Sequence, residues 1–189
     1  EGAAIWAYKK DKAAGRIINI GSHPEGSTYG EKLQITEACF RYAIDGVGTP
    51  NLKGKLKPGV ERHMNKLTSD NDPDHTRIGD LQYHHYSFEI TEPTTNIQVE
   101  LKGEKDFDFC LYLKKDTPAF RSNADYAVTG SGNTKTIRRQ LTTGKWFVSV
   151  ECTTTVKAEL DGCRGFFNYS GKTSVLNGAA YRIKLVTGN

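Results

Sequence analysis

The segments DFDFCLYLKKDTPAF (residues 106–120) and TKTIRRQLTTGKWFVSVE (residues 134–151) decide the fold of this 189-residue chain. Large apolar residues stand at every second position: Phe107, Phe109, Leu111 and Leu113 in the first segment, and Trp146, Val148 and Val150 in the second. Such alternation is typical of a strand with one face on a core and the other toward water. The segments therefore predict two strands of an antiparallel β domain, with Trp146 as a core anchor.

Further alternating sets extend this domain in both directions. They are Tyr86, Phe88 and Ile90, then Ile97, Val99 and Leu101 after a turn at Pro93, and finally Tyr181, Ile183 and Leu185. Several short strands with polar turns between them favour a sandwich of two sheets. The predicted fold class is mainly β: an antiparallel, jelly-roll-like β-sandwich over residues 81–189, with no helix longer than a turn or two.

Residues 1–48 have a different pattern. Residues 3–9 and 16–20 predict two short strands, and residues 31–45 predict a helix with an apolar stripe, ended by Gly46. Such a unit is too small to hold its own core. Because the chain also starts at Glu1 without Met, we expect it to be a fragment or processed product, with residues 1–48 as the remnant of a larger α/β domain.

Residues 49–80 lack sustained periodicity and predict a linker, with one helical turn near residues 60–67. Asp70, Asp72 and Asp74 alternate as in a calcium loop. However, His75 stands where an EF-hand needs glycine, and Leu81 stands where it needs a bidentate glutamate. We therefore expect a solvated loop, and neither a metal nor a cofactor.

Charge and hydropathy exclude two function classes. The chain has 26 Lys and Arg against 22 Asp and Glu, a net charge of +4 without a concentrated basic block. A nucleic-acid-binding protein normally has a basic face interleaved with aromatic residues. No stretch reaches the apolar length that spans a membrane. We therefore expect neither a nucleic acid as partner nor a membrane span.

The four cysteines leave two alternatives open. Cys152 and Cys163 flank a polar loop and could form a disulfide, but the spacing does not decide this, because pairing depends on the separation of their Cα atoms. The alternative is that they are reduced, buried, small apolar residues. Cys39 falls on the predicted helix.

Three other polar features predict no chemistry. His84 and His85 are adjacent, so on a strand they point to opposite faces and are expected to be strand-edge residues without a catalytic role. The segment 130–136 is glycine-rich, but it lacks the Gly-Lys-Ser/Thr order of a phosphate loop and precedes a strand. It predicts a turn.

Four quoted segments carry a family resemblance: DFCLYLKK, NADYAVTGSGNTKTI, TTGKWFVSVE and GAAYRIKLV, within residues 108–186. Together they resemble the bacterial pre-peptidase C-terminal domain, over roughly residues 80–189. Cys110 stands where that family often has a second acidic residue, so no calcium role is expected for Asp106 and Asp108. The resemblance implies a non-catalytic C-terminal accessory domain of a secreted or periplasmic protein, of the kind that assists secretion, stability or contact with a peptide or carbohydrate ligand.

A second resemblance rests on GRIINIGSHPEG at residues 15–26. It is similar to the C-terminal catalytic segment of class I glutamine amidotransferases, and covers residues 3–45. The resemblance implies that His23 is the base that activates a cysteine nucleophile upstream of this chain, and that Glu25 orients His23. Cys39 follows the histidine and cannot be that nucleophile. We expect His23 at the end of a parallel-type strand, the rest of the parent domain as a partner, and no activity in this chain alone.

Overall fold

The computed structural model describes the backbone of β1 (Ile5–Lys9) and β2 (Arg16–Ile20), the residue Cys39, and residues 52–66, 76–160 and 167–188. The chain divides into two compact units, Glu1–Thr49 and Pro50–Asn189. In the first unit, β1 and β2 confirm the two predicted strands. They pair antiparallel. The expected place of His23 at the end of a parallel-type strand stays a prediction, because His23 lies outside the described residues. Cys39 is helical, as predicted, and its thiol is free.

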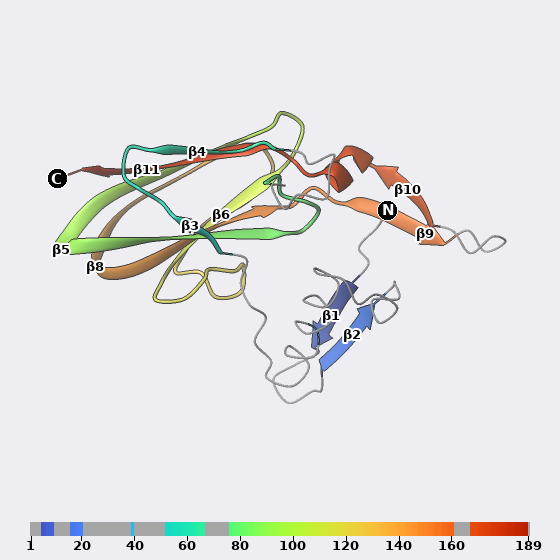
Figure 1. The fold of residues 1–189 in the computed structure, drawn as a ribbon, viewed down its shortest axis with the longest axis horizontal. Coiled ribbons are helices and arrows are strands. Elements are labelled where there is room, and N and C mark those ends of the chain that lie inside the picture. Colours follow the sequence, from blue (N-terminus) through green and yellow to red (C-terminus); the bar gives the residue numbers. More distant parts are fainter. Residues whose placement is uncertain are drawn as a thin grey trace. The chain divides into compact units, whose positions relative to one another are not determined.

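The second unit is built from one seven-stranded sheet and a separate two-stranded hairpin (Figure 1). The sheet contains β3 (Leu52–Lys55), β4 (Glu61–Met64), β5 (Tyr83–Gly103), β6 (Phe109–Lys115), β7 (Tyr126–Val128), β8 (Thr134–Cys152) and β11 (Tyr181–Gly188). The hairpin contains β9 (Val156–Leu160) and β10 (Phe167–Gly171), and a short 3-10 helix, η2 (Thr173–Asn177), precedes β11.

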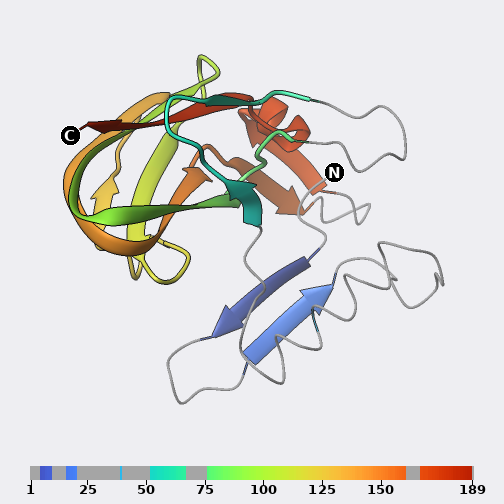
Figure 2. The same ribbon diagram turned by 60° about the vertical axis from the view of Figure 1, so that its left-hand side comes forward.

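Two unusually long strands, β5 and β8, bend and fold the sheet onto itself (Figure 2). Their pairing shifts register between Ile90 and Thr94, next to Pro93, which has no N–H to donate to a ladder. The first half of β5 pairs with the second half of β8, and this layer also holds β3, β6 and β7. The other halves pair with each other and, with β11 and β4, form the second layer.

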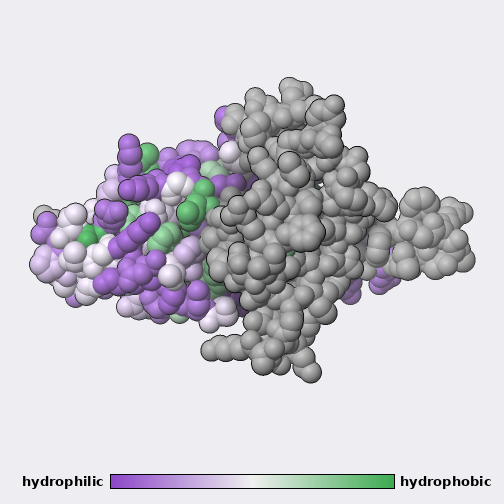
Figure 3. Space-filling model, turned by 60° about the horizontal axis from the view of Figure 1, so that its bottom comes forward, coloured by the Kyte–Doolittle hydropathy of each residue, from purple (hydrophilic) through white to green (hydrophobic). Residues whose placement is uncertain are grey.

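The core fills the space between the two layers. Every alternating set read from the sequence is buried there, including Trp146 with 5 % of its surface exposed and Ile183 with none. Burial of such side chains contributes roughly 1.5–3 kcal/mol each, which makes this face the main source of stability. Over its described residues, the face shown in Figure 3 is mainly hydrophilic, with scattered apolar side chains.

These observations confirm a mainly antiparallel β fold, with almost no helix among the residues that the structure describes. The two layers of the sandwich belong to one continuous sheet, because β5 and β8 run from one layer into the other.

The predicted linker at residues 49–80 is wrong for the parts that the structure describes. β4 pairs with β11 in place of the expected helical turn, and β3 pairs in parallel with β5. Leu56, Met64 and Ile78 belong to the core. These segments are short and irregularly patterned because each supplies only one or two apolar residues, so period-two alternation never develops.

The prediction that alternate positions face water is wrong for one region. Cys110, Tyr112, Ser149 and Glu151 point away from the main core, yet each is at most 5 % exposed. The connection from β6 to β7 lies over them, so the outer side of this layer is covered.

Candidate binding site

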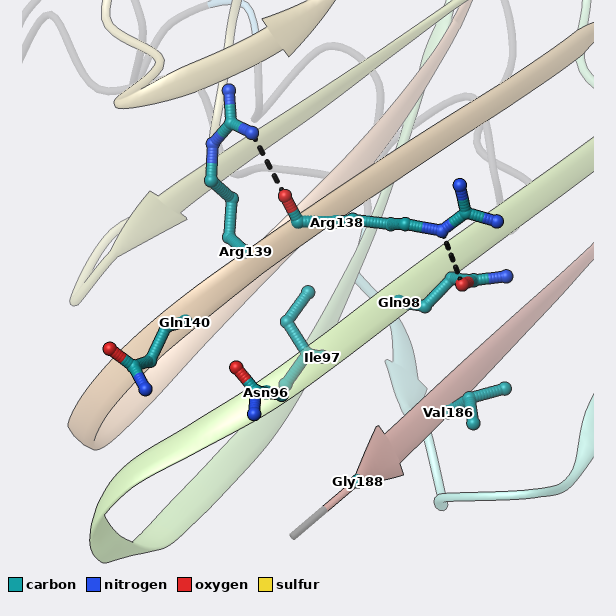
Figure 4. Close-up of a pocket in the computed structure, with 8 residues that line it drawn as sticks. All are labelled: Asn96, Ile97, Gln98, Arg138, Arg139, Gln140, Val186 and Gly188. Atoms are coloured by element: carbon teal, nitrogen blue, oxygen red, sulfur yellow. Dashed lines mark hydrogen bonds between the residues drawn. The ribbon is translucent and has the colours of Figure 1, made fainter.

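A shallow groove of about 460 Å³ lies on the water-facing side of the second layer (Figure 4). It crosses three neighbouring strands, β11, β5 and β8. Its lining residues are Asn96, Ile97, Gln98, Arg138, Arg139, Gln140, Val186 and Gly188. Three carboxamides and a guanidinium on rigid strands form a surface rich in hydrogen-bonding groups.

The strand register explains why these side chains meet. Gln98 pairs with Arg138 on one side and with Val186 on the other, while Asn96 pairs with Gln140. Residues directly opposite each other on neighbouring strands lie on the same face. Successive outward positions of β5 and β8 therefore gather in the groove, while the alternate positions, such as Val99, fill the core.

Hydrogen bonds hold part of the groove in place. Nε of Arg138 donates to Oε1 of Gln98 at 2.6 Å, and the Gln98 amide nitrogen donates to Glu100. The two terminal guanidinium nitrogens of Arg138 make no hydrogen bond to a described side chain (Figure 4). A guanidinium with both terminal nitrogens available can bind a carboxylate or another oxygen-rich group by donating two parallel hydrogen bonds.

Arg139, the next residue along β8, points to the other side of the strand (Figure 4). Its guanidinium carbon lies 4.9 Å from the ring centre of Tyr126, and Nη1 donates to the Arg138 carbonyl at 2.9 Å. The guanidinium of Arg139 is therefore held against Tyr126 and the strand backbone, whereas that of Arg138 lies beside Gln98.

A second hollow of about 230 Å³ lies on the same layer, at the other end of the strands. It is lined by His63, Asn65, Lys102, Gly103, Glu104, Ala180, Tyr181 and Arg182. Glu61 contacts both His63, at 3.0 Å, and Arg182, at 3.4 Å. Glu104, which also lines this hollow, is paired with Arg77 at 3.6 Å. The charges at this end are therefore of both signs, and Lys102 is the lining cation that has no ion pair with a described residue.

The covered side of the first layer holds a serine–histidine pair. Nδ1 of His85 and the hydroxyl of Ser149 are 2.6 Å apart, and the two side chains are 1 % and 0 % exposed. The imidazole is stacked on Tyr83, with 5.9 Å between ring centres, and the edge of Phe120 closes over it at 4.7 Å. Burial lowers the pKa of His85 to about 4.

A buried carboxylate lies beside this pair. Oε2 of Glu151 accepts a hydrogen bond from the Tyr112 hydroxyl at 2.5 Å. The same oxygen forms an ion pair with Nη2 of Arg121 at 3.3 Å. Burial, and then the hydrogen bond to Glu151, raise the pKa of Tyr112 well above its usual value. Arg121 thereby ties the β6–β7 connection to the sheet. Among the described residues, no carboxylate is hydrogen-bonded to His85, and its enclosed position gives substrate no access to Ser149 in this conformation.

The two histidines do point to opposite faces, as predicted, but neither lies at a strand edge. β5 is an interior strand, and Nδ1 of His84 lies 2.7 Å from the hydroxyl of Tyr181 in the main core. Residues 130–133 form the predicted turn, and residues 134–136 already belong to β8. The ammonium of Lys135 is buried and donates to the carbonyls of Ser131 and Gly132, at 2.9 and 2.8 Å.

The structure also places the cysteines. Cys110 and Cys152 are buried and free, so the alternative of reduced, apolar cysteines is confirmed for both, and the disulfide from Cys152 is not formed. Cys163 lies outside the described residues. Cys152 is the last residue of β8 and belongs to the core cluster, and its sulfur lies 4.0 Å from the carbonyl oxygen of Thr154.

His23 and Glu25 lie outside the described residues, as do Asp70, Asp72 and Asp74, so their roles stay predictions. In the part of the chain that the structure does describe, no three His, Cys, Asp or Glu side chains gather where they could hold a metal ion. That part also contains no helix long and apolar enough to cross a membrane.

The sequence does not reveal the groove directly, because only the apolar half of each alternating pattern carries a clear structural signal. Asn96, Gln98, Arg138 and Gln140 occupy the other half, on two strands whose register the sequence does not reveal. The available signal is the cluster of carboxamides at outward positions, where lysine, glutamate or threonine would suit a solvated strand as well.

Comparisons with solved structures give two similar folds of low identity. The first is the pre-peptidase C-terminal domain of a collagenase from Bacillus anthracis, with 14 % identity, 72 % of this chain and 96 % of that chain covered, and a TM-score of 0.39. The second is PliG from Aeromonas hydrophila, a periplasmic lysozyme inhibitor of g-type lysozyme, with 9 % identity, 74 % and 100 % covered, and a TM-score of 0.43. No curated protein is significantly similar in sequence.

The family comparison is more specific, because it matches a defined segment. That segment contains the whole bend of β5, together with β6, β7 and nearly all of β8. It thus includes the β5 and β8 residues of the groove and the covered serine–histidine pair. Residues 82–151 match the family described as the bacterial pre-peptidase C-terminal domain, and it is this family that the central part of the chain resembles.

Proposed function

We propose that residues 50–189 are a non-catalytic accessory domain of a larger, exported bacterial protein, and that the domain binds a polar polymer in the groove at Gln98 and Arg138. The observation that carries the proposal is the groove itself: Asn96, Gln98 and Gln140 beside the Arg138 guanidinium, on the exposed side of paired strands. Rigid strands position such groups more precisely than loops do, which favours recognition.

Two further observations support an accessory role over a catalytic one. The match of residues 82–151 is to a family whose description places it at the C-terminal end of bacterial pre-peptidases. The serine–histidine pair of Ser149 and His85 is sealed beneath Phe120, with the imidazole pKa lowered to about 4. That environment suits a structural hydrogen bond, since a general base works best with a pKa near the operating pH.

Co-sedimentation with insoluble polymers tests the proposal. The 189-residue protein is incubated with fibrous proteins and with polysaccharides, and the bound fraction is compared with that of the double variant Gln98→Ala/Arg138→Ala. Lys157→Ala serves as the matched control, because Lys157 is exposed on β9, in a different sheet. We expect retention of the wild-type protein on at least one polymer, and its loss only in the double variant. Equal retention of all three proteins, or none of the wild type, would reject the proposal.

The alternative function concerns the parent protein. The resemblance of residues 3–45 to class I glutamine amidotransferases implies a Cys-His-Glu triad, with His23 and Glu25 from this chain and the cysteine upstream. This alternative rests on that resemblance alone. The 189-residue chain is expected to hydrolyse neither glutamine nor activated esters, whereas His23→Ala in an active parent should cost several orders of magnitude in turnover.

A further inference from the structure

The groove and the second hollow lie on one continuous surface, which we call the polar face. It consists of the outward side chains of β4, β11, the second half of β5 and the first half of β8. The strand register arranges these side chains in cross-strand rows. From one end to the other they are Gly188, Asn96 and Gln140; then Val186, Gln98 and Arg138; then Glu61, Lys184, Glu100 and Thr136; and finally His63, Arg182, Lys102 and Thr134.

Charge along the polar face follows a pattern. The row of Arg138 has a cation without an anion, and the next row combines Lys184 with two glutamates. The last row carries Lys102 and Arg182, of which Arg182 is paired with Glu61 at 3.4 Å. Lys102 is exposed and makes no ion pair with a described residue. Two positive rows thus flank a mixed one, and a ligand that matches this field has two anions with a neutral or mixed centre.

The spacing of the rows identifies the shape of such a ligand. Outward residues of a strand recur every second position, or about 6.6 Å, so the Arg138 and Lys102 rows are about 13 Å apart along β5. An extended peptide has the same rise per residue. Laid along the strands, it presents residues i and i+4 to the two positive rows and residue i+2 to the mixed row.

From this match we propose that the polar face binds an extended acidic peptide segment with carboxylates at positions i and i+4. The proposal rests on the proposed function and names its ligand. The first carboxylate pairs with the terminal nitrogens of Arg138, and the second with Lys102 and Arg182. The carboxamides of Asn96, Gln98 and Gln140 donate to and accept from the peptide backbone, which offers an N–H and a C=O at each residue.

A peptide fits the polar face better than a neutral polysaccharide does. The outward residues that the structure describes on this face include no Trp, Tyr or Phe, the side chains on which sugar rings stack. The only sizeable apolar side chain among them is Val186, at 37 % exposure. Charge-assisted hydrogen bonds therefore dominate, and the affinity should fall as salt screens them.

Synthetic peptides test the proposal on the full 189-residue protein. Fluorescence anisotropy at low ionic strength compares a labelled seven-residue Thr/Val peptide bearing Glu at positions 2 and 6 with two controls, one with Glu at positions 2 and 5 and one with Lys at positions 2 and 6. We expect the first peptide to bind at least tenfold more tightly than the Lys peptide and several-fold more tightly than the misplaced-Glu peptide. Raising the salt concentration from about 0.05 to 0.5 M should weaken binding at least tenfold.

Charge-reversal variants locate the site. Arg138→Glu and Lys102→Glu should each weaken binding of the 2,6-Glu peptide at least tenfold. Lys157→Glu changes the net charge equally on another sheet and should leave affinity within twofold. Circular dichroism and melting temperature confirm that each variant is folded. Equal weakening in all three variants would show nonspecific attraction and overturn the proposal, as would equal binding of the 2,5-Glu and 2,6-Glu peptides.

A polyuronate arm separates this inference from the proposed function. If soluble polygalacturonate binds and Arg138→Glu abolishes its binding, while no acidic peptide binds, the peptide proposal is wrong and the accessory binding function stands. If neither peptides nor any polymer binds to the wild-type protein, both are wrong.

Discussion

His85 and Ser149 stand directly opposite each other on β5 and β8, with 2.6 Å between Nδ1 and the hydroxyl oxygen. Both face outward from their layer, yet Phe120 of the β6–β7 connection covers them. The pair therefore has the contacts of a buried structural hydrogen bond. Since burial lowers the pKa of His85 to about 4, the imidazole is neutral in the folded protein at neutral pH.

This predicts a pH dependence of stability. In the unfolded chain His85 has an ordinary pKa of 6.5, so between pH 6.5 and about 4 the unfolded state binds a proton that the folded state does not. The free energy of unfolding should therefore fall as pH falls through this window, by on the order of 2 kcal/mol after allowance for solvent screening. Urea unfolding at pH 7 and pH 4.5, compared between wild type and His85→Asn, measures this. An identical pH dependence in the two proteins would refute it.

A glycine substitution tests the packing at the far end of β5. A Cβ added at Gly103 would lie 2.1 Å from Cε2 of Phe109, whose ring is fully buried. Because the ring has no open space to enter, Gly103→Ala should destabilise the domain by roughly 1–3 kcal/mol. Chemical denaturation measures the loss. Gly188→Ala is the matched control, because a Cβ at Gly188 would meet no atom within 4 Å, so this substitution should change stability little. Gly59→Ala is unsuitable as a control, because Gly59 has a φ of 78°, which disfavours alanine.

The placement of residues 52–66 in the sheet predicts where the folding unit begins. A protein of residues 50–189 should unfold cooperatively with a β-type far-UV spectrum. A protein starting at Gly79 lacks the buried side chains of Leu56, Met64 and Ile78 and exposes the edge of β11 that β4 covers. It should lose several kcal/mol, at roughly 1.5–3 kcal/mol for each buried side chain. Equal melting temperatures of the two proteins would restore the linker interpretation.

The buried thiols predict slow chemical reactivity. Burial raises the pKa of Cys152 to about 12, so at neutral pH almost none of it is thiolate, the form that reacts with alkylating reagents. In the native protein, Cys110 and Cys152 should resist iodoacetamide, and both should react fully in urea without reductant. Peptide mass mapping after alkylation distinguishes them. A Cys152 that reacts in urea only after reduction would indicate a disulfide.

Much of the fold could be predicted from the sequence, since one face of each long strand is continuously apolar. Phe109, Val148 and Ile183 are buried because burial of large side chains dominates folding free energy, and period-two spacing records it directly. At Pro93 the sequence predicts a turn between two strands, whereas the structure has a bend within one strand, β5. A turn and a bulged bend contain the same residue types, and only the pairing with β8 distinguishes them.

The candidate site could not be predicted in the same way. The groove depends on which outward residues become neighbours, and that depends on the register between β5, β8 and β11. The cover over Tyr112 and Glu151 was equally hidden, because segment 116–125 has ordinary loop composition. Its anchors, Phe120 and Arg121, acquire their roles only through tertiary contacts with His85 and Glu151.

The most direct test of the central claim is a backbone amide map of the ligand contact on isotopically labelled protein. NMR titration with the tightest-binding peptide or soluble polymer should shift the amides of residues 96–102, 134–140 and 182–188, the strands of the polar face. Amides around His85 and Ser149, on the covered side of the other layer, should stay unchanged. Shifts concentrated at residues 83–87 and 145–151 would place the ligand over the serine–histidine pair and contradict the account.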